Sequence, residues 1–254
     1  MSSISGQSVL ILGGSSGMGF GIAKLCLGDH IRVAIASSSQ AKVDNALRRL
    51  TKIHPNAKSL LNGYVIDLDS DDVETEMERI LSDVTKHGTV PLDHIVYTAG
   101  RPDMHAISDI DLMSLFKSAQ LPLFVPFLLG KLAPKYLREG RSSSLIFTSG
   151  QVAERPVPGF SIPAAYATGL QGLTRNLACE LAPRRVNCVV APGSSATEPW
   201  GDRAESMRDT AAEKSPLGKP PASVEDVAEA FAYLMRNTDA TGSIVSTNSG
   251  SVLK

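Results

Sequence analysis

Few features of this sequence point to an extracellular, metal-binding or nucleic-acid-binding protein. Its 254 residues include only 3 cysteines, and Cys26, Cys179 and Cys188 lack the spacing of a disulfide framework or a zinc site. We interpret them as small core residues in a reducing compartment. Lys and Arg number 25 and Asp and Glu 26, which leaves no net charge to attract nucleic acid or an anionic membrane. A small-molecule substrate is therefore the expected partner, and no metal site is expected.

Long apolar segments and targeting signals are also missing. The N-terminal stretch MSSISGQSVLILGGSSG passes from polar residues directly into a short apolar run, without the basic region or cleavage site of a secretory signal. No apolar stretch is expected to approach the roughly 18 residues that span a bilayer. These patterns predict a cytoplasmic protein.

Short runs of β-branched and apolar residues recur along the chain, at intervals that leave room for a helix between them. The intervening segments carry helical periodicity, as in Val227, Phe231 and Leu234. This alternation predicts an α/β fold, with residues 1–254 forming a single doubly wound Rossmann domain of about seven parallel strands and helices on both faces. The expected strands are 8–13, 32–37, 63–68, 94–100, 144–150, 185–193 and 242–250.

A glycine-rich loop joins the first expected strand to the first helix. Gly13, Gly17 and Gly19 in LGGSSGMGFG allow a tight turn, a close approach of backbone amides to a pyrophosphate, and packing of the helix against the strand. The positive end of the helix then faces the phosphates. The placement between strand and helix predicts a dinucleotide site. Its expected contact residues are Gly13, Ser15, Ser16, Gly17, Met18 and Gly19.

The end of the second strand, IASSSQAK, indicates which dinucleotide binds. NAD-specific folds place a carboxylate there, which would repel a 2′-phosphate. This chain instead has the hydroxyls of Ser37, Ser38 and Ser39, followed by the positive charge of Lys42. The pattern favours NADP(H). A lysine on a solvated helix surface remains the alternative interpretation of Lys42.

The least regular segment, 194–222, contains the only tryptophan and follows the sixth expected strand. It therefore leaves the carboxyl edge of the sheet, where ligands of open α/β sheets bind. We expect a substrate lid there, with an ordinary long surface loop as the alternative.

Several motifs, in the right order, resemble those of the short-chain dehydrogenase/reductases from one end of the chain to the other. GGSSGMG is similar to the family's glycine motif, and YTAG at 97–100 replaces its Asn-Asn-Ala-Gly. The resemblance implies that an NADP(H) cofactor contacts further positions, and that the helices 108–138 and 163–182 pair between subunits of a homodimer or homotetramer. The implied cofactor contacts are Asp67 and Leu68 at the adenine, Ala99, Gly100, Pro192 and Gly193, with Thr197 at the nicotinamide carboxamide.

In this family a tyrosine transfers the proton, and a lysine four residues later lowers the pKa of its hydroxyl. The family pattern that follows the lysine, G-L-x-G-L-T-R-x-L-A, begins here at Gly169. This register places Ala167 at the lysine position and Pro163 at the tyrosine position. Tyr166 lies three residues too late, and a register that used it would place Leu170 at the lysine position. The Tyr-Lys pair is therefore expected to be missing.

Other polar residues near the same edge are candidates for the chemistry. Ser149 lies within one residue of the family's serine, whereas the asparagine position falls near Ala119, with Gln120 beside it. Tyr166 could reach the pocket or pack between helices. Glu154 and Arg155 follow Ser149 and could act as an acid or an electrophilic clamp, or form a solvated ion pair. Arg101, Trp200 and Asp202 are weaker candidates.

Two functions remain open on this reasoning. One is an atypical NADP(H)-dependent oxidoreductase that reduces a C=O or C=N⁺ group, since hydride addition to an iminium ion needs no proton donor in the same step. The chain looks similar to a divergent fungal branch of the family whose members include secondary-metabolism reductases that also guide a Diels–Alder closure. The alternative is a non-redox isomerase or cyclase, or an NADP sensor, that holds the cofactor without turnover.

Overall fold

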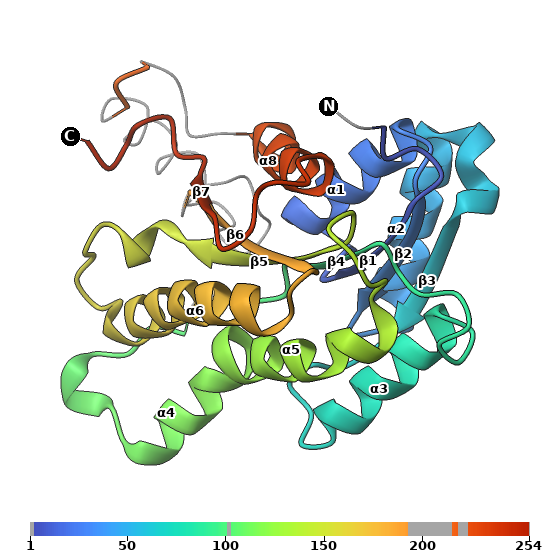
Figure 1. Cartoon of the computed structure of the whole chain (residues 1–254). Coiled ribbons are helices and arrows are strands. Elements are labelled where there is room, and N and C mark those ends of the chain that lie inside the picture. The colour runs from blue at the N-terminus through green and yellow to red at the C-terminus, as the bar shows by residue number, and fades with distance from the viewer. Residues whose placement is uncertain (1–2, 101–102, 193–214, 218–222, 254) are drawn as a thin grey trace.

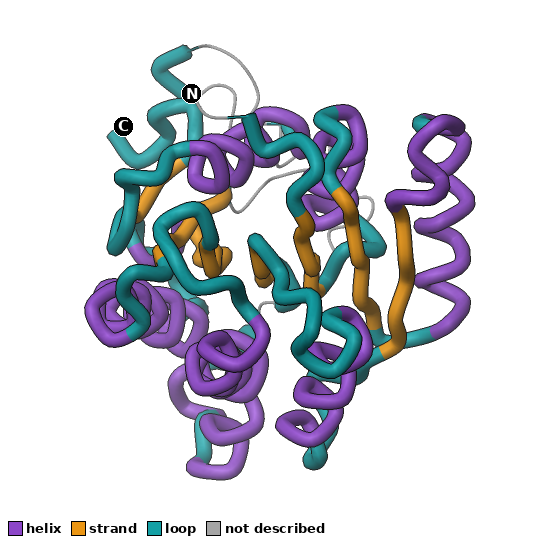
Figure 2. Tube along the Cα trace, turned by 45° about the vertical axis from the view of Figure 1, so that its right-hand side comes forward, coloured by secondary structure: helices purple, strands orange, loops and turns teal. Residues whose placement is uncertain are grey.

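The computed structural model describes residues 3–100, 103–192, 215–217 and 223–253. These residues form a seven-stranded parallel sheet with helices on both sides (Figures 1 and 2). The predicted α/β Rossmann architecture is thereby confirmed. The strands are β1 (Ser8–Leu12), β2 (Arg32–Ser37), β3 (Leu61–Val65), β4 (His94–Tyr97), β5 (Ser144–Gly150), β6 (Arg185–Ala191) and β7 (Ile244–Ser246).

The strand order is β3-β2-β1-β4-β5-β6-β7, so the chain reverses direction across the sheet after β3. β1 pairs with β2 on one side and β4 on the other, with Val9 opposite both Val33 and His94. In doubly wound sheets a ligand binds at such a switch point, outside the carboxyl ends of the strands. The carboxyl ends of β1 and β4 therefore define where a ligand site is to be sought.

Helices cover each face of the sheet, and alternation along β1 divides the core between the two faces. Leu10 and Leu12 belong to one apolar cluster, and Val9 and Ile11 to the other, because successive side chains of a strand point in opposite directions. The first cluster includes residues of α3 (Val73–Val84), α5 (Val125–Tyr136) and α6 (Ser161–Glu180), and the second includes residues of α1 (Gly17–Gly28), α2 (Gln40–Ile53) and α8 (Val224–Arg236). Short 3₁₀ segments span Pro55–Leu60, Ile107–Asp109 and Gln151–Ala153.

The interpretation of the cysteines as core residues holds for two of the three. Cys26 and Cys188 are buried, and burial raises the pKa of each thiol to about 12. Cys179, near the end of α6, is exposed. The interpretation was wrong there because position 179 follows two core positions, Leu177 and Ala178, and the helix has turned toward the surface.

α4 (Leu112–Ala119) and α5 are joined by a π-helical turn, Gln120–Phe124, so Leu112–Tyr136 is one helical stretch. By length and composition this stretch is apolar enough to cross a membrane, which corrects the expectation that no such segment exists. Core helices of soluble proteins meet the same criterion. The inner face of α5 has that role, because Val125, Leu129 and Ala133 are fully buried in the core beneath the sheet.

A buried polar cluster lies at the amino end of the central strands. The Asp93 carboxylate accepts hydrogen bonds from the Ser8 backbone and hydroxyl, both 2.9 Å, and from Arg138 at 2.7 Å. Burial alone would raise the pKa of Asp93, but these hydrogen bonds hold it below its usual value. The neighbouring His94 imidazole bonds Ser144 and Gln7, each at 2.8 Å. One neutral tautomer satisfies both contacts, and burial lowers the His94 pKa to about 3.

We predict that His94 makes the protein sensitive to mild acid. The unfolded chain takes up the His94 proton below about pH 6.5 while the folded protein resists it, so stability is fully present above that pH and falls as pH decreases. Between pH 7 and pH 5, His94→Gln should reduce the loss of unfolding free energy by about 2 kcal/mol. Urea unfolding of both proteins at the two pH values measures this. An equal loss in both would show that the folded imidazole accepts a proton readily.

Candidate active site

The glycine loop packs closely against the end of β4. Gly13 has φ +91°, in the left-handed region, and a Cβ there would lie 2.7 Å from the Ala99 nitrogen. A Cβ on Gly19 would lie 2.2 Å from the Gly13 carbonyl oxygen. Only glycine fits at these two positions, so the backbone between β1 and α1 forms a tight concave turn. Such a turn at a helix N-terminus is suited to a pyrophosphate.

The polar residues predicted around this loop have separate roles. Ser16 is the N-cap residue of α1, and among the described residues its side chain makes no capping hydrogen bond. Ser15 and Ser37 share a hydrogen bond of 2.7 Å between their hydroxyls, which ties the loop to the end of β2. Ser39 caps α2 by accepting from the Lys42 backbone at 3.4 Å.

Ser38 and Lys42 are brought together at the surface. The Lys42 ammonium donates to the Ser38 hydroxyl at 2.9 Å, and both residues are exposed. Ser38 directly follows Ser37, so this pair lies next to the Ser15–Ser37 contact at the carboxyl end of β2. A hydroxyl and an ammonium held side by side match the needs of a phosphate group.

The predicted adenine contacts lie just beyond β3. Leu68 is buried and Asp67 is exposed, with one Asp67 carboxylate oxygen accepting from the Asp69 backbone at 3.1 Å. The turn after β3 is fastened to the start of the π-helical segment, because the Gln120 amide donates to the carbonyls of Leu68 at 3.0 Å and Ser70 at 2.8 Å. Ala119, near which the family's asparagine position is predicted, is buried, while the neighbouring Gln120 bonds the turn after β3.

Ser149 is turned toward α6. Its buried hydroxyl donates to the carbonyl oxygen of Ala167 at 3.0 Å. A hydroxyl has one proton, so in this arrangement Ser149 can offer a substrate only an acceptor. The contact also locates Ala167, the residue predicted at the family's lysine position, directly beside the predicted serine.

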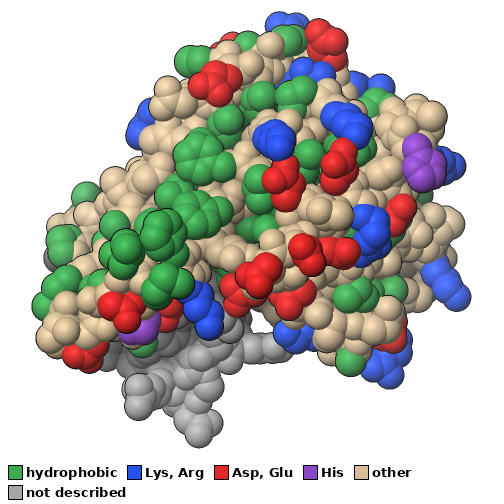
Figure 3. All heavy atoms as spheres, turned by 90° about the horizontal axis from the view of Figure 1, so that it is seen from below, with side chains coloured by type: hydrophobic (Ala, Val, Ile, Leu, Met, Phe, Trp, Pro, Cys, Tyr) green, Lys and Arg blue, Asp and Glu red, His purple; other side chains and the backbone are tan. Residues whose placement is uncertain are grey.

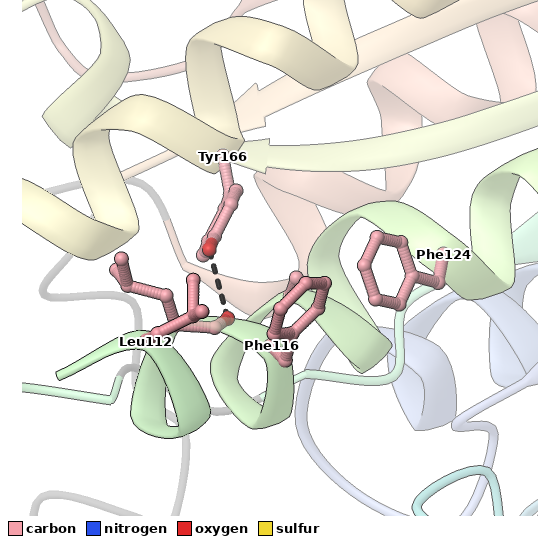
Figure 4. Close-up of a pocket in the computed structure, with 6 residues that line it drawn as sticks. Leu112, Phe116, Phe124 and Tyr166 are labelled. Atoms are coloured by element: carbon pink, nitrogen blue, oxygen red, sulfur yellow. Dashed lines mark hydrogen bonds between the residues drawn. The ribbon is translucent and has the colours of Figure 1, made fainter.

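Tyr166 points toward α4. Its hydroxyl donates to the Leu115 carbonyl at 2.8 Å (Figure 4), and burial raises the pKa of the phenol above its usual value. The ring lines a shallow apolar pocket of about 200 Å³. α6 contains no lysine anywhere along its length. A phenol that donates to a backbone carbonyl, with no ammonium on its helix, lacks the usual means of becoming a base. The other lining residues are Leu112, Leu115, Phe116, Ala119 and Phe124.

Glu154 and Arg155 contact the C-terminal segment. Glu154 accepts from the Ser246 hydroxyl at 2.5 Å, and Arg155 donates to the Ser251 carbonyl at 2.5 Å. Gln151 adds a 2.7 Å bond to the Ser251 hydroxyl. Among the described residues the two side chains form no ion pair with each other, and their role as an acid or an electrophilic clamp stays a prediction. The loop after β5 is instead fastened to the chain that follows β7.

Asp103 and His105 were missed by the sequence reasoning. They follow β4, and His105 Nε2 lies 2.9 Å from an Asp103 carboxylate oxygen. The Ser118 hydroxyl of α4 donates to the other oxygen of the same carboxylate. The stretch GRPDMH places both residues within five positions of Gly100, and an acid and a histidine so close to a cofactor motif were the available signal.

Several predicted residues lie outside the described part of the chain. They are Gly193, Thr197, Arg101, Trp200 and Asp202, together with the whole of the expected lid 194–222 except Ser215–Leu217. Pro192 is described and is buried directly after β6. Ala99 is partly buried and Gly100 exposed at the end of β4.

Comparison with known proteins identifies the class. The profile of the SDR-like Rossmann domain matches residues 2–254, and the chain belongs to the short-chain dehydrogenase/reductase family. It is 38% identical over 260 residues to the short-chain dehydrogenase/reductase ATR9 of Stachybotrys chlorohalonatus, covering 100% of both chains. It is 36% identical to fsr5 of Gibberella fujikuroi over 264 residues, covering 100% of this chain and 97% of that one.

A solved structure of a fungal relative has the same fold. The MalC reductase/Diels-Alderase from Malbranchea aurantiaca superposes with a TM-score of 0.91 at 34% identity, covering 98% of this chain and 97% of that chain. An actinorhodin polyketide ketoreductase with NADPH, 22% identical, shares the fold with a TM-score of 0.81. The resemblance to a divergent fungal branch of the family is therefore confirmed.

Proposed function

We propose that this protein is an NADP(H)-dependent oxidoreductase with an atypical active site, which reduces a C=O or C=N⁺ group of a small, secondary-metabolite-like substrate. One contrast carries the proposal. The glycine loop has a shape that only glycine allows, whereas the Tyr166 hydroxyl of α6, a helix without lysine, donates to the Leu115 carbonyl of α4. The glycine loop therefore supports cofactor binding, while the contacts of α6 argue against the family's usual proton relay. We expect the reaction to take place in the cytoplasm.

The described residues fit a dinucleotide. Side chains at Gly13 and Gly19 would collide with backbone, so only glycine allows the tight turn whose amides a pyrophosphate would approach. Ser38 and Lys42 present a hydroxyl and a positive charge where a 2′-phosphate would lie, and Leu68 offers an apolar wall for the adenine. When bound, the reduced nicotinamide supplies a hydride.

The walls of the site contribute positioning. Gln120 holds the turn at Leu68, and the bonds from Gln151 and Arg155 to Ser251 hold the C-terminal segment against the loop after β5. Rigid walls of this kind orient a bound substrate, and orientation alone supplies a large part of many rate enhancements. An iminium substrate is suited to this site, because its carbon accepts a hydride without a proton in the same step.

A non-redox reaction is the second candidate. It is favoured by the similarity to a protein described as both a reductase and a Diels-Alderase, at 34% identity. A cyclase or isomerase would use the same walls as a shaped template, and a sensor would bind NADP without turnover.

We predict that the purified protein oxidises NADPH when mixed with N-alkyl dihydroisoquinolinium salts or bicyclic ketones. Loss of nicotinamide absorbance measures hydride transfer. Tyr166→Phe should retain kcat within about threefold, because a general acid that was lost would cost about 100-fold or more.

NADPH that binds with a measurable Kd but is consumed with none of these compounds would contradict the reductase and leave the non-redox alternative. A severe loss of turnover in Tyr166→Phe would show that the phenol is the proton donor after all.

We predict that Lys42 selects NADPH over NADH. Lys42→Ala should raise the Kd for NADPH about tenfold, through loss of a charge-assisted contact worth about 1.4 kcal/mol, and leave the Kd for NADH nearly unchanged. Nicotinamide fluorescence measures both values. Lys52→Ala, at the other end of α2, is the matched control. Equal affinity of the wild-type protein for the two cofactors would refute the assignment.

We also propose that a second copy of this chain covers the apolar surface of α4 and α5. Hydrophobic side chains gather on this face (Figure 3), and five of them are 40–73% exposed. Such a patch is larger than isolated surface residues explain, and its position on 108–138 agrees with the helices expected to pair between subunits. The five are Leu112, Met113, Phe116, Phe124 and Phe127.

Introducing charge on this face should therefore separate the subunits. Light scattering after size exclusion should give a dimer or tetramer for the wild-type protein and a monomer for Met113→Glu/Phe116→Glu. Ile53→Glu, at an exposed apolar position on α2, is the control and should not change the mass. A monomeric wild-type protein at micromolar concentration would contradict the proposal.

A further inference from the structure

The contact between Asp103 and His105 lies beside the proposed site and has no place in the family's usual relay. His105 Nε2 faces one Asp103 oxygen at 2.9 Å, and the buried Ser118 hydroxyl donates to the other oxygen. The Asp103 carboxylate is thus held from α4 on one side and orients the imidazole on the other. The two side chains are 44% and 33% exposed, so they are open to a small molecule.

The chain brings this pair close to the cofactor loop. Thr98 donates from its backbone and hydroxyl to the Leu12 carbonyl, and Ala99 is the backbone that Gly13 meets. Asp103 follows Ala99 by four residues, which limits the separation of their Cα atoms to about 14 Å. The pair therefore follows closely on the end of β4, on the side of the sheet where ligands of doubly wound folds bind.

The Asp103 carboxylate is held by a hydrogen bond from α4. Ser118 directly precedes Ala119, the residue at the family's asparagine position, and Gln120 bonds the turn at Leu68. The contact of Asp103 with Ser118 thus places the carboxylate against the same helix end that forms the wall of the site.

The contact with Asp103 decides which ring nitrogen of His105 is available, because Nε2 lies 2.9 Å from the Asp103 carboxylate. With Nε2 directed at Asp103, Nδ1 is on the opposite side of the ring and is the nitrogen that can transfer a proton.

We propose that His105 is the proton donor for carbonyl reduction in this protein and that Asp103 is its positioning residue. This inference rests on the proposed reductase function. The carbonyl carbon gains a hydride from bound NADPH, the π pair of the C=O bond moves to oxygen, and that oxygen takes the Nδ1 proton of the imidazolium. The products are the alcohol, NADP⁺ and neutral His105, which regains a proton from solvent. An iminium substrate gains the hydride, its electron pair returns to nitrogen, and no proton is needed.

Comparing two substrate classes tests the assignment. His105→Gln should lower kcat/KM for bicyclic ketones about 100-fold, the usual contribution of a general acid, and change kcat/KM for N-alkyl dihydroisoquinolinium salts by less than about threefold. Asp103→Asn should lower ketone reduction in the same direction. His87→Gln, an exposed histidine in the turn after α3, and Asp109→Asn, a carboxylate of the same loop that accepts from Ser108, are matched controls. An equal fall for both substrate classes would show a structural role and overturn the proposal.

A measurement that needs no turnover separates this inference from the proposed function. Carbethoxylation by diethyl pyrocarbonate, followed by peptide mass spectrometry, should be slower at His105 when NADP⁺ and a bicyclic ketone are present together, and unchanged at His87. The Kd of His105→Gln for NADPH should equal that of the wild-type protein. An unprotected His105 would overturn the proposal even if the protein reduces ketones, whereas absence of NADPH oxidation with every compound would contradict the reductase itself.

Discussion

The close contact between the glycine loop and the end of β4 is the constraint on which the site depends. A Cβ on Gly19 would lie 2.2 Å from the Gly13 oxygen, and one on Gly13 would lie 2.7 Å from the Ala99 nitrogen. These approaches bring β1, α1 and β4 together at the switch point of the sheet. The packing therefore fixes the point from which the segment with Asp103 and His105 leaves β4. The glycine loop and the end of β4, from which the segment with Asp103 and His105 continues, are thus packed together.

Two hydrogen bonds of α6 join this helix to its neighbours in the fold. In α6, the Ala167 carbonyl accepts from Ser149 and the Tyr166 hydroxyl donates to Leu115 of α4. Both hydroxyls donate to a backbone carbonyl. Their hydrogen bonds join α6 to β5 and to α4, so these side chains contribute to packing. Hydride transfer to an electrophile remains compatible with such a site, since the cofactor carries the reducing electrons.

The strands were the most predictable part of the fold. Their apolar runs have the right length and composition for buried parallel strands, and each observed strand lies within or beside its predicted range. The ends were less predictable: β3 ends at Val65 and not at Leu68, and β7 is Ile244–Ser246. The predicted ranges included IDL at 66–68 and TNSG at 247–250. In the structure these residues lie beyond the last residues that pair with a neighbouring strand. The partners of Glu154 and Arg155 were beyond prediction, because Ser246 and Ser251 are more than ninety positions away in sequence.

The sequence by itself determined the α/β class, the glycine loop and the absence of lysine from α6, because these follow from local periodicity, from glycine's conformational freedom and from composition. Only the tertiary structure decided which polar side chains meet. Ser149 turns to Ala167, Tyr166 to Leu115 and Asp103 to Ser118 and His105. The physical reason is that a buried or half-buried polar group must find a hydrogen-bond partner, and the partner within reach depends on how helices and strands distant in sequence pack together.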